Sequence, residues 1–256
     1  MRRTFIASIL FLSILLFVLA RKAAMRGATF ASILLIAIPA HADDASPLPN
    51  TTILELKLGF FEPRVGDSPG VLGNPYVQTF GNSPMLLGVL EVDRSLLHAY
   101  GYLGVGLSVG YGEKYAKALL ADGTPSGEAT GLIVLPIRAM VVYRYDVLAH
   151  VMHIPLVPYA ELGPVLYPWW TEKGGSVEIV NGEKGSGFRF GWGFSLGLAL
   201  ELDFLNPTSS REAREDAGIH HFYLFGEFND DFAANFGGPG LNLGAAYFAF
   251  GIAFEF

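Results

Sequence analysis

The sequence contains no cysteine and few charged residues, and both shortages narrow the class of protein. Without cysteine, the 256-residue chain has neither a disulfide framework nor a cysteine-based metal site or nucleophile. Charged residues make up 16% of the chain and hydrophobic residues 51%, which is an apolar composition for a soluble protein. After residue 42, however, no uninterrupted apolar run of about 18 residues occurs, so no membrane-spanning helix is predicted there. High apolar content without long runs is typical of alternating strands.

The first 42 residues have the features of a targeting region rather than of a folded domain. Residues 1–20 begin with the basic residues Arg2 and Arg3 and continue as an apolar run to Ala20. A second segment of this kind begins at Met25 and ends in Ala40-His41-Ala42, which fits a signal-peptidase site. We therefore expect cleavage after Ala42, followed by a short polar lead over residues 43–51.

Met25 is the preferred start of the protein, which makes residues 1–24 an upstream extension. One long signal is an alternative, and a retained inner-membrane anchor over Thr4–Ala20 is another. The chain after residue 42 holds 12 basic and 24 acidic residues. Such an acidic chain lacks the basic surface that nucleic acid requires, so no nucleic-acid partner is expected.

Strict alternation of large and small side chains is clearest at residues 187–203. Large apolar residues occupy the even positions from Phe188 to Leu202, and small or charged residues occupy the odd positions. A period of two predicts a strand and excludes an amphipathic helix. The same alternation predicts seven further strands, at Thr52–Phe61, Met85–Asp93, Tyr100–Tyr111, Gly131–Asp146, Leu156–Trp170, His220–Asn229 and Asn242–Phe256.

Eight strands of this kind predict an all-β fold, an eight-stranded antiparallel transmembrane β-barrel over residues 52–256. The strand number is even, and many strands reach the roughly 9–11 residues that a tilted membrane strand needs. The large apolar face would meet lipid, and the face rich in Gly, Ser and Ala would line a narrow lumen. A soluble lipocalin-like barrel is the rival, but its core would need the large residues inside.

Loop lengths predict the orientation of the barrel. The connections after the first, third, fifth and seventh strands are long, so we expect them outside the cell and both termini in the periplasm. The connection at Leu205–Gly218 is long for an inner turn. It begins with Asn206-Pro207 and continues with polar residues, which predicts a short capped polar helix between strands six and seven.

The chain ends on an apolar strand whose last aromatic residues are Phe254 and Phe256. A terminal aromatic residue of this kind resembles the signal that the outer-membrane insertion machinery recognises. We therefore expect Phe256, with Phe254, to direct assembly. The expected partners are outer-membrane lipid and this machinery, and no surface ligand is indicated.

Several segments resemble a family of outer-membrane β-barrel proteins from myxobacteria and related Gram-negative bacteria. The segments are YRYDVLAHVMHIPLVPYAELG, YPWWTEKGG, FGWGFSLGLALELDFLNP, GIHHFYLFGEF and the terminal GIAFEF. The resemblance covers roughly Thr52 to Phe256. It implies a barrel in the outer membrane, but it implies no ligand or reaction, so no functional residues carry over.

Charged residues on the predicted lumen face are the first candidate site. They are Glu55, Lys57, Glu91, Arg138, Arg144, Glu161, Arg189, Glu201 and Glu227. Eight strands leave little room inside a barrel, and unpaired charges there would be costly. We therefore expect a salt-bridged plug, with an ion or solute path as the alternative.

Histidines near the periplasmic rim are a weaker candidate site. They are His98, His150, His153, His220 and His221. Such a group could bind a transition metal or sense pH. No ligand spacing such as HExxH occurs, so we expect neither a metal nor another cofactor.

Catalytic motifs are absent from the sequence. There is no GxSxG, no phosphate-binding loop and no dinucleotide fingerprint, and Ser108 and Ser195 have no nearby histidine in the predicted register. We therefore expect a structural or surface-interaction barrel rather than an enzyme. A small pore or ligand carrier is the main alternative, and a lipid-modifying barrel enzyme is a weaker one.

Overall fold

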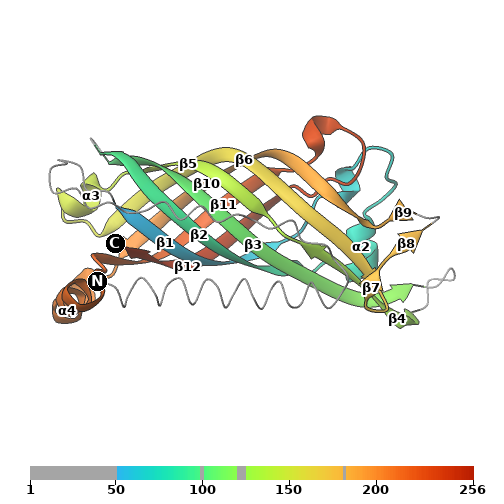
Figure 1. The fold of residues 1–256 in the computed structure, drawn as a ribbon, viewed down its shortest axis with the longest axis horizontal. Helices are drawn as coiled ribbons and strands as arrows, with labels where there is room; N and C mark the ends of the chain where they lie inside the picture. The colour runs from blue at the N-terminus through green and yellow to red at the C-terminus, as the bar shows by residue number, and fades with distance from the viewer. Residues whose placement is uncertain (1–50, 99–100, 120–124, 181–182) are drawn as a thin grey trace.

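The computed structural model describes residues 51–98, 101–119, 125–180 and 183–256. The expected targeting region, its expected cleavage site and nearly all of the expected polar lead lie outside the described residues. The described chain winds into one barrel of tilted strands, with α2 at one end and α3 and α4 at the other (Figure 1). We call these the α2 end and the α4 end.

The barrel wall is a closed antiparallel ring. Its strands are β1 (Thr52–Phe61), β2 (Met85–His98), β3 (Tyr102–Leu119), β4 (Pro125–Val134), β5 (Ile137–Arg144), β6 (Leu156–Lys173), β10 (Ser186–Glu201), β11 (His221–Phe232) and β12 (Ala245–Glu255). Each pairs with the next, except that β4 and β5 each pair with β3 and β6 and not with each other, and β12 pairs with β1. Because β4 and β5 share one place between β3 and β6, the ring has eight strands, which confirms the predicted fold class.

Short elements occupy the connections between these strands. They are η1 (Val65–Asp67), α2 (Pro75–Phe80), α3 (Val147–His150), β7 (Ser176–Val177), β8 (Ile179–Val180), β9 (Glu183–Lys184), η2 (Asp203–Leu205), α4 (Pro207–Ala217) and η3 (Asn235–Gly237). The polar helix predicted between the sixth and seventh strands is therefore present as α4. The Asn206 side chain caps its start by accepting a hydrogen bond from the Ser209 N–H, and Gly218 ends it at φ 69°.

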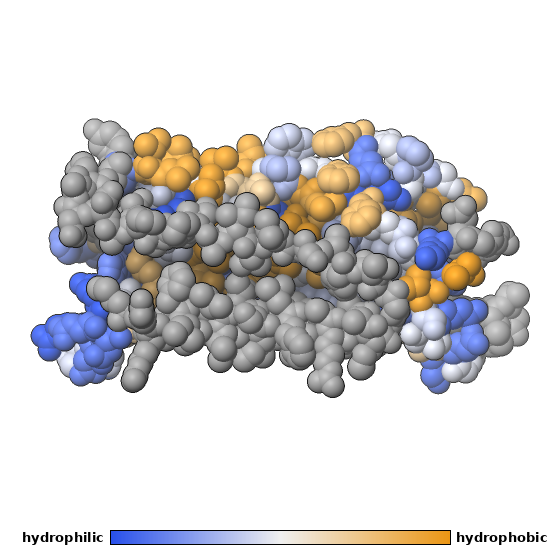
Figure 2. Space-filling view, in the orientation of Figure 1, coloured by the Kyte–Doolittle hydropathy of each residue, from blue (hydrophilic) through white to orange (hydrophobic). Residues whose placement is uncertain are grey.

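The two faces of the wall have the predicted polarity. Leu198 and Phe250 are 47% and 55% exposed on the outside, whereas Ser195 and Glu161 are 0% and 2% exposed on the lumen side. Hydrophobic side chains lie over the strands and hydrophilic ones gather at α4, at the lower left (Figure 2). A barrel that is apolar outside and polar inside is built to span a membrane, and this excludes the lipocalin-like arrangement.

No helix among the described residues is long and apolar enough to cross a membrane.

The fourth strand differs from its prediction. We expected one strand over Gly131–Asp146, but the structure divides it into β4 and β5 at Leu135–Pro136. Pro136 has no N–H to donate to a neighbouring strand, and proline is therefore placed at breaks in sheets. The long strand β3 continues past the break and pairs with both pieces.

Ring closure brings the first and last strands together. The Thr52 N–H donates to the Phe256 carbonyl oxygen at 3.1 Å, and the Phe256 N–H donates back to Thr52 at 2.9 Å. Thr52 and Phe256 therefore lie side by side at the α4 end of the wall.

Candidate functional site

A layer of buried charged side chains crosses the middle of the lumen. Its members are all at most 3% exposed: Glu55, Lys57, Glu91, Asp93, Arg138, Arg144, Glu161, Glu227 and Asp231. We call this set the charged layer. It arises because alternation places every second residue of each strand in the lumen. Seven of the nine lumen charges predicted from the sequence belong to it.

Lys57 is the cation around which most of the acids gather. Its Nζ atom lies 2.9 Å from Glu91, 3.0 Å from Glu55 and from Glu227, and 3.8 Å from Glu161. Glu55 and Glu91 are directly opposite each other on β1 and β2. Because like charges in that position repel, the ammonium group between them is what makes the pair tolerable.

Arg144 forms the second centre of the layer. Its guanidinium group donates to Glu55 and, at 2.7 Å, to Asp93. The same guanidinium lies 4.5 Å from the centre of the Tyr159 ring, a distance at which a cation is attracted to an aromatic face. Glu55 therefore connects the Arg144 centre to the Lys57 centre.

Arg138 forms the third centre, on the side of the layer nearer the α2 end. It donates to Asn229 at 2.9 Å and to Ser195 at 2.7 Å, and its Nε lies 3.5 Å from Asp231. Asn229 donates in turn to Glu227 at 3.0 Å. The three centres thus form one connected network of ion pairs and hydrogen bonds.

Apolar clusters pack against the charged layer from both ends. The cluster at the α2 end includes Phe61, Tyr167 and Tyr247, with the Phe61 ring 5.9 Å from that of Tyr167 and 5.6 Å from that of Tyr247. The cluster at the α4 end is made of buried residues that include Tyr159 and Phe225. The lumen is therefore a filled core, consistent with the narrow interior of eight strands.

Two predicted lumen charges lie outside the charged layer. Arg189 is half-buried towards the α2 end, where it donates to the Phe188 carbonyl oxygen at 3.3 Å. Glu201 is half-buried at the α4 end, 3.5 Å from His221. Both lie on the predicted face of β10. They are near the two ends of this strand, however, and therefore lie beyond the packed core.

Sequence reasoning did not include Asn229 and Asp231 among the candidate lumen residues. They follow Glu227 at spacings of two and four along β11. The alternation therefore predicts that both share the lumen face with Glu227. The predicted strand ends at Asn229, because the following connection, Asp230–Leu241, is rich in Gly, Asn, Asp and Pro. In the structure β11 continues to Phe232, and Asp231 is fully buried against Arg138 and Tyr167.

The histidines whose side chains the structure describes are exposed or have separate acidic partners. His98 contacts Asp146 at 2.8 Å, and His221 contacts Asp203 at 2.7 Å. His153 and His220 are exposed, and His150 is the last residue of α3. Within the described ranges, no potential metal-binding group contains two histidines; the group with one consists of Glu201, Asp203 and His221.

Comparison with known proteins finds similar solved structures among bacterial outer-membrane proteins. No protein-family model matches it, and no curated protein sequence does. The structure is similar to the attachment invasion locus protein Ail of Yersinia pestis, in complex with the heparin analogue sucrose octasulfate. Identity is 10% and the TM-score 0.45, over 82% of this chain and 100% of that one.

Two further solved structures show the same level of likeness. The N-terminal β-barrel domain of OprF from Pseudomonas aeruginosa is 13% identical, with a TM-score of 0.35 over 81% of this chain and 98% of that one. The outer-membrane protease OmpT of Escherichia coli is 9% identical, with a TM-score of 0.34 over 81% and 94%. Likeness at this level assigns no ligand and no activity.

Proposed function

We propose that the protein is an outer-membrane β-barrel with a structural or surface-interaction role, and that its lumen is a plug rather than a pore. The observation that carries this proposal is the charged layer held between two apolar clusters. An ion entering from either end would have to cross packed aromatic side chains without water, which is costly for a charge. It would then have to separate buried ion pairs, which is also costly.

The orientation and surface role follow from the shape of the connections. We propose that the α4 end, with both ends of the barrel segment, faces the periplasm, and that the α2 end faces outward. The connections at the α2 end carry η1, α2, β7 to β9 and η3, whereas those at the α4 end carry α3, η2 and the polar helix α4. A binding partner at the cell surface would contact the elements at the α2 end.

Assembly is proposed to depend on the terminal aromatic residues. Phe256 is 37% exposed at the end of the last strand, and the Phe254 ring packs 5.6 Å from that of Phe222. An exposed terminal side chain is available to the insertion machinery, whereas Phe254 is tied to its neighbour. The relationship to the myxobacterial-type family and the absence of catalysis both stay predictions.

Planar-bilayer conductance of the purified barrel tests the plug. We expect no stable conductance from the wild-type protein. The control is a variant in which Tyr167 and Tyr247 are both replaced by Ala, which opens the α2-end cluster. Its conductance is compared with that of the wild-type barrel after both have inserted into the bilayer. Stable, sizeable current through the wild-type barrel would reject the plug and support the pore.

A further inference from the structure

Three side chains with metal-binding atoms converge at the α4 end, where β10 ends and β11 begins. Glu201 is the last residue of β10, Asp203 the first of η2 and His221 the first of β11. One ligand atom of each lies within 4.8 Å of those of the other two. The His221 Nδ1 atom lies 2.7 Å from Asp203 and 3.5 Å from Glu201. One imidazole nitrogen and two carboxylates therefore surround one point.

The backbone fixes this arrangement. Glu201 pairs with Tyr223, and His221 lies two residues before Tyr223 on the same face of β11. The Phe222 N–H donates to the Asp203 Oδ1 atom at 3.3 Å, while the Oδ2 atom of the same carboxylate contacts His221. A hydrogen bond to the second oxygen of a carboxylate orients the first oxygen for a metal ion.

Charge and access favour a divalent cation at this point. Glu255 lies directly opposite His221 on β12, and adds a third carboxylate beside the group. The side chains of Glu201, Asp203 and His221 are 17%, 15% and 21% exposed, so water can complete the coordination of an ion. The acids of the charged layer differ, because they are buried and contact the cations of the layer itself.

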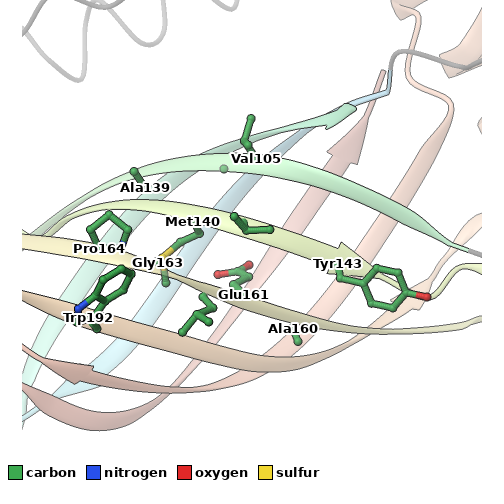
Figure 3. Close-up of a pocket in the computed structure, with 12 residues that line it drawn as sticks. Val105, Ala139, Met140, Tyr143, Ala160, Glu161, Gly163, Pro164 and Trp192 are labelled. Carbon is green, nitrogen blue, oxygen red and sulfur yellow. The ribbon is translucent and has the colours of Figure 1, made fainter. Parts of the chain in front are cut away.

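The groove on the outer wall lacks such a set of ligands. It lies over the seam between β5 and β6, has a volume of about 660 Å³ and is lined mainly by apolar side chains (Figure 3). Glu161 also lines it, but its side chain is 0% exposed and turned to Lys57 in the lumen. The close approach of Gly163 to the Ala139 carbonyl oxygen closes the seam. The groove therefore presents an apolar surface to lipid and no carboxylate to an ion.

We propose that Glu201, Asp203 and His221 bind a divalent transition-metal ion, and that Zn²⁺ fits them best. Zn²⁺ binds imidazole nitrogen and carboxylate oxygen at about 2.0–2.2 Å, usually with four ligands. Tetrahedral bonds of this length put two ligand atoms about 3.4 Å apart, close to the 3.5 Å between His221 and Glu201. The ion takes the place of the proton between His221 Nδ1 and Asp203, which is released to solvent, and water fills the fourth position.

The ion joins the two ends of the connection that carries η2 and α4. This connection leaves the barrel wall after Glu201 and returns to it at His221. A metal ion that closes a long loop restricts the unfolded chain and so stabilises the fold. Histidine spacing alone did not predict the site, because two of its three ligands are carboxylates. The site depends neither on the plug nor on the proposed surface role.

Calorimetric titration of the untagged, chelator-treated barrel in detergent tests the site. We expect Zn²⁺ to bind in a 1:1 ratio and Mg²⁺ to bind at least about tenfold more weakly, because Mg²⁺ prefers oxygen ligands in octahedral geometry. Co²⁺ should give the visible absorption of a four- or five-coordinate ion with the wild-type barrel, a result that needs no variant. Absence of Zn²⁺ binding, or equal affinity for Mg²⁺, would overturn the proposal.

Three variants locate the ion. His221→Gln should weaken Zn²⁺ binding by about 100-fold or more, since loss of a group that only orients a ligand already costs about 10–100-fold. Glu201→Gln should also weaken it, and serves if His221→Gln does not assemble. His98→Gln is the matched control: His98 contacts Asp146 at 2.8 Å but belongs to no group of three potential ligands among the described residues, so affinity should not change. Equal affinity in all three variants would mean adventitious binding to surface histidines and reject the site.

Discussion

Lys57 is the residue whose loss should cost the barrel most. Replacing it with Met keeps most of its volume but leaves Glu55, Glu91 and Glu227 without the ammonium group that all three contact. Breaking a buried ion pair by removing one partner typically costs about 3–5 kcal/mol. We expect Lys57→Met to lower the free energy of unfolding by about that much, measured by urea titration in lipid vesicles.

Lys173→Met is the matched control for this substitution. Lys173 pairs with Glu128 at 3.3 Å, but the two side chains are 49% and 62% exposed. Exposed pairs contribute about 0–1 kcal/mol, so the control should unfold nearly as the wild type does. Equal losses in the two variants would show that the charged layer is not the stabilising feature described above.

At the residue scale, alternation was enough to place Glu55, Lys57 and Glu161 in the lumen, because the side-chain period of a strand is two. It could not tell which charges meet. Lys57 and Glu227 are 170 positions apart in the chain, and their contact depends on how far each strand is shifted against the next around the ring. No local pattern in the sequence records that shift.

The outward face of β10 gives a prediction at the scale of a single element. Leu198 is exposed on the lipid side and pairs with Gly226, in the middle of the neighbouring strand β11. An arginine at the bilayer midplane of a barrel costs about 2–4 kcal/mol, so Leu198→Arg should lower the free energy of unfolding in vesicles by that amount. Normal stability of the variant would mean that this face does not meet lipid.

The control for this face is Leu205→Arg, at the end of η2. Leu205 is 67% exposed and lies beyond the strand, next to α4. Near the membrane interface, the cost of an arginine falls to about 0–1 kcal/mol. Comparable destabilisation by the two substitutions would place both residues at the same depth and contradict the arrangement of the wall.

Element boundaries show where sequence patterns stop being informative. The first strand begins and ends as predicted, because Glu62 and Pro63 interrupt its alternation immediately afterwards. The fourth strand does not, because Pro136 has no N–H to donate and interrupts the ladder, although its carbonyl oxygen still accepts from the Gly110 N–H at 2.7 Å. The register with β3 is the same before and after the break, so the face that each side chain occupies does not change.

At the scale of the whole molecule, Phe256 extends the pairing of β1 with β12 that closes the ring. Deleting Phe256 removes both backbone hydrogen bonds that join it to Thr52 and the aromatic end of the chain. We expect a several-fold lower yield of inserted barrel, measured by its heat-dependent mobility on gels. Phe236→Ala, which removes an exposed phenylalanine from η3, should leave the yield unchanged. An unchanged yield after the deletion would remove the proposed assembly role.

The charged layer also disfavours barrels in which the strands pair in the wrong register. If any strand carrying a layer residue slipped by one position, its whole lumen face would turn outward, and a charge such as Glu55 or Arg144 would enter hydrocarbon. A slip by two would keep the face but separate Lys57 from its partners. A slip by one position and a slip by two positions are therefore both destabilising. The residues that fill the lumen therefore select one strand register from the many that the repetitive outer surface of the barrel would tolerate.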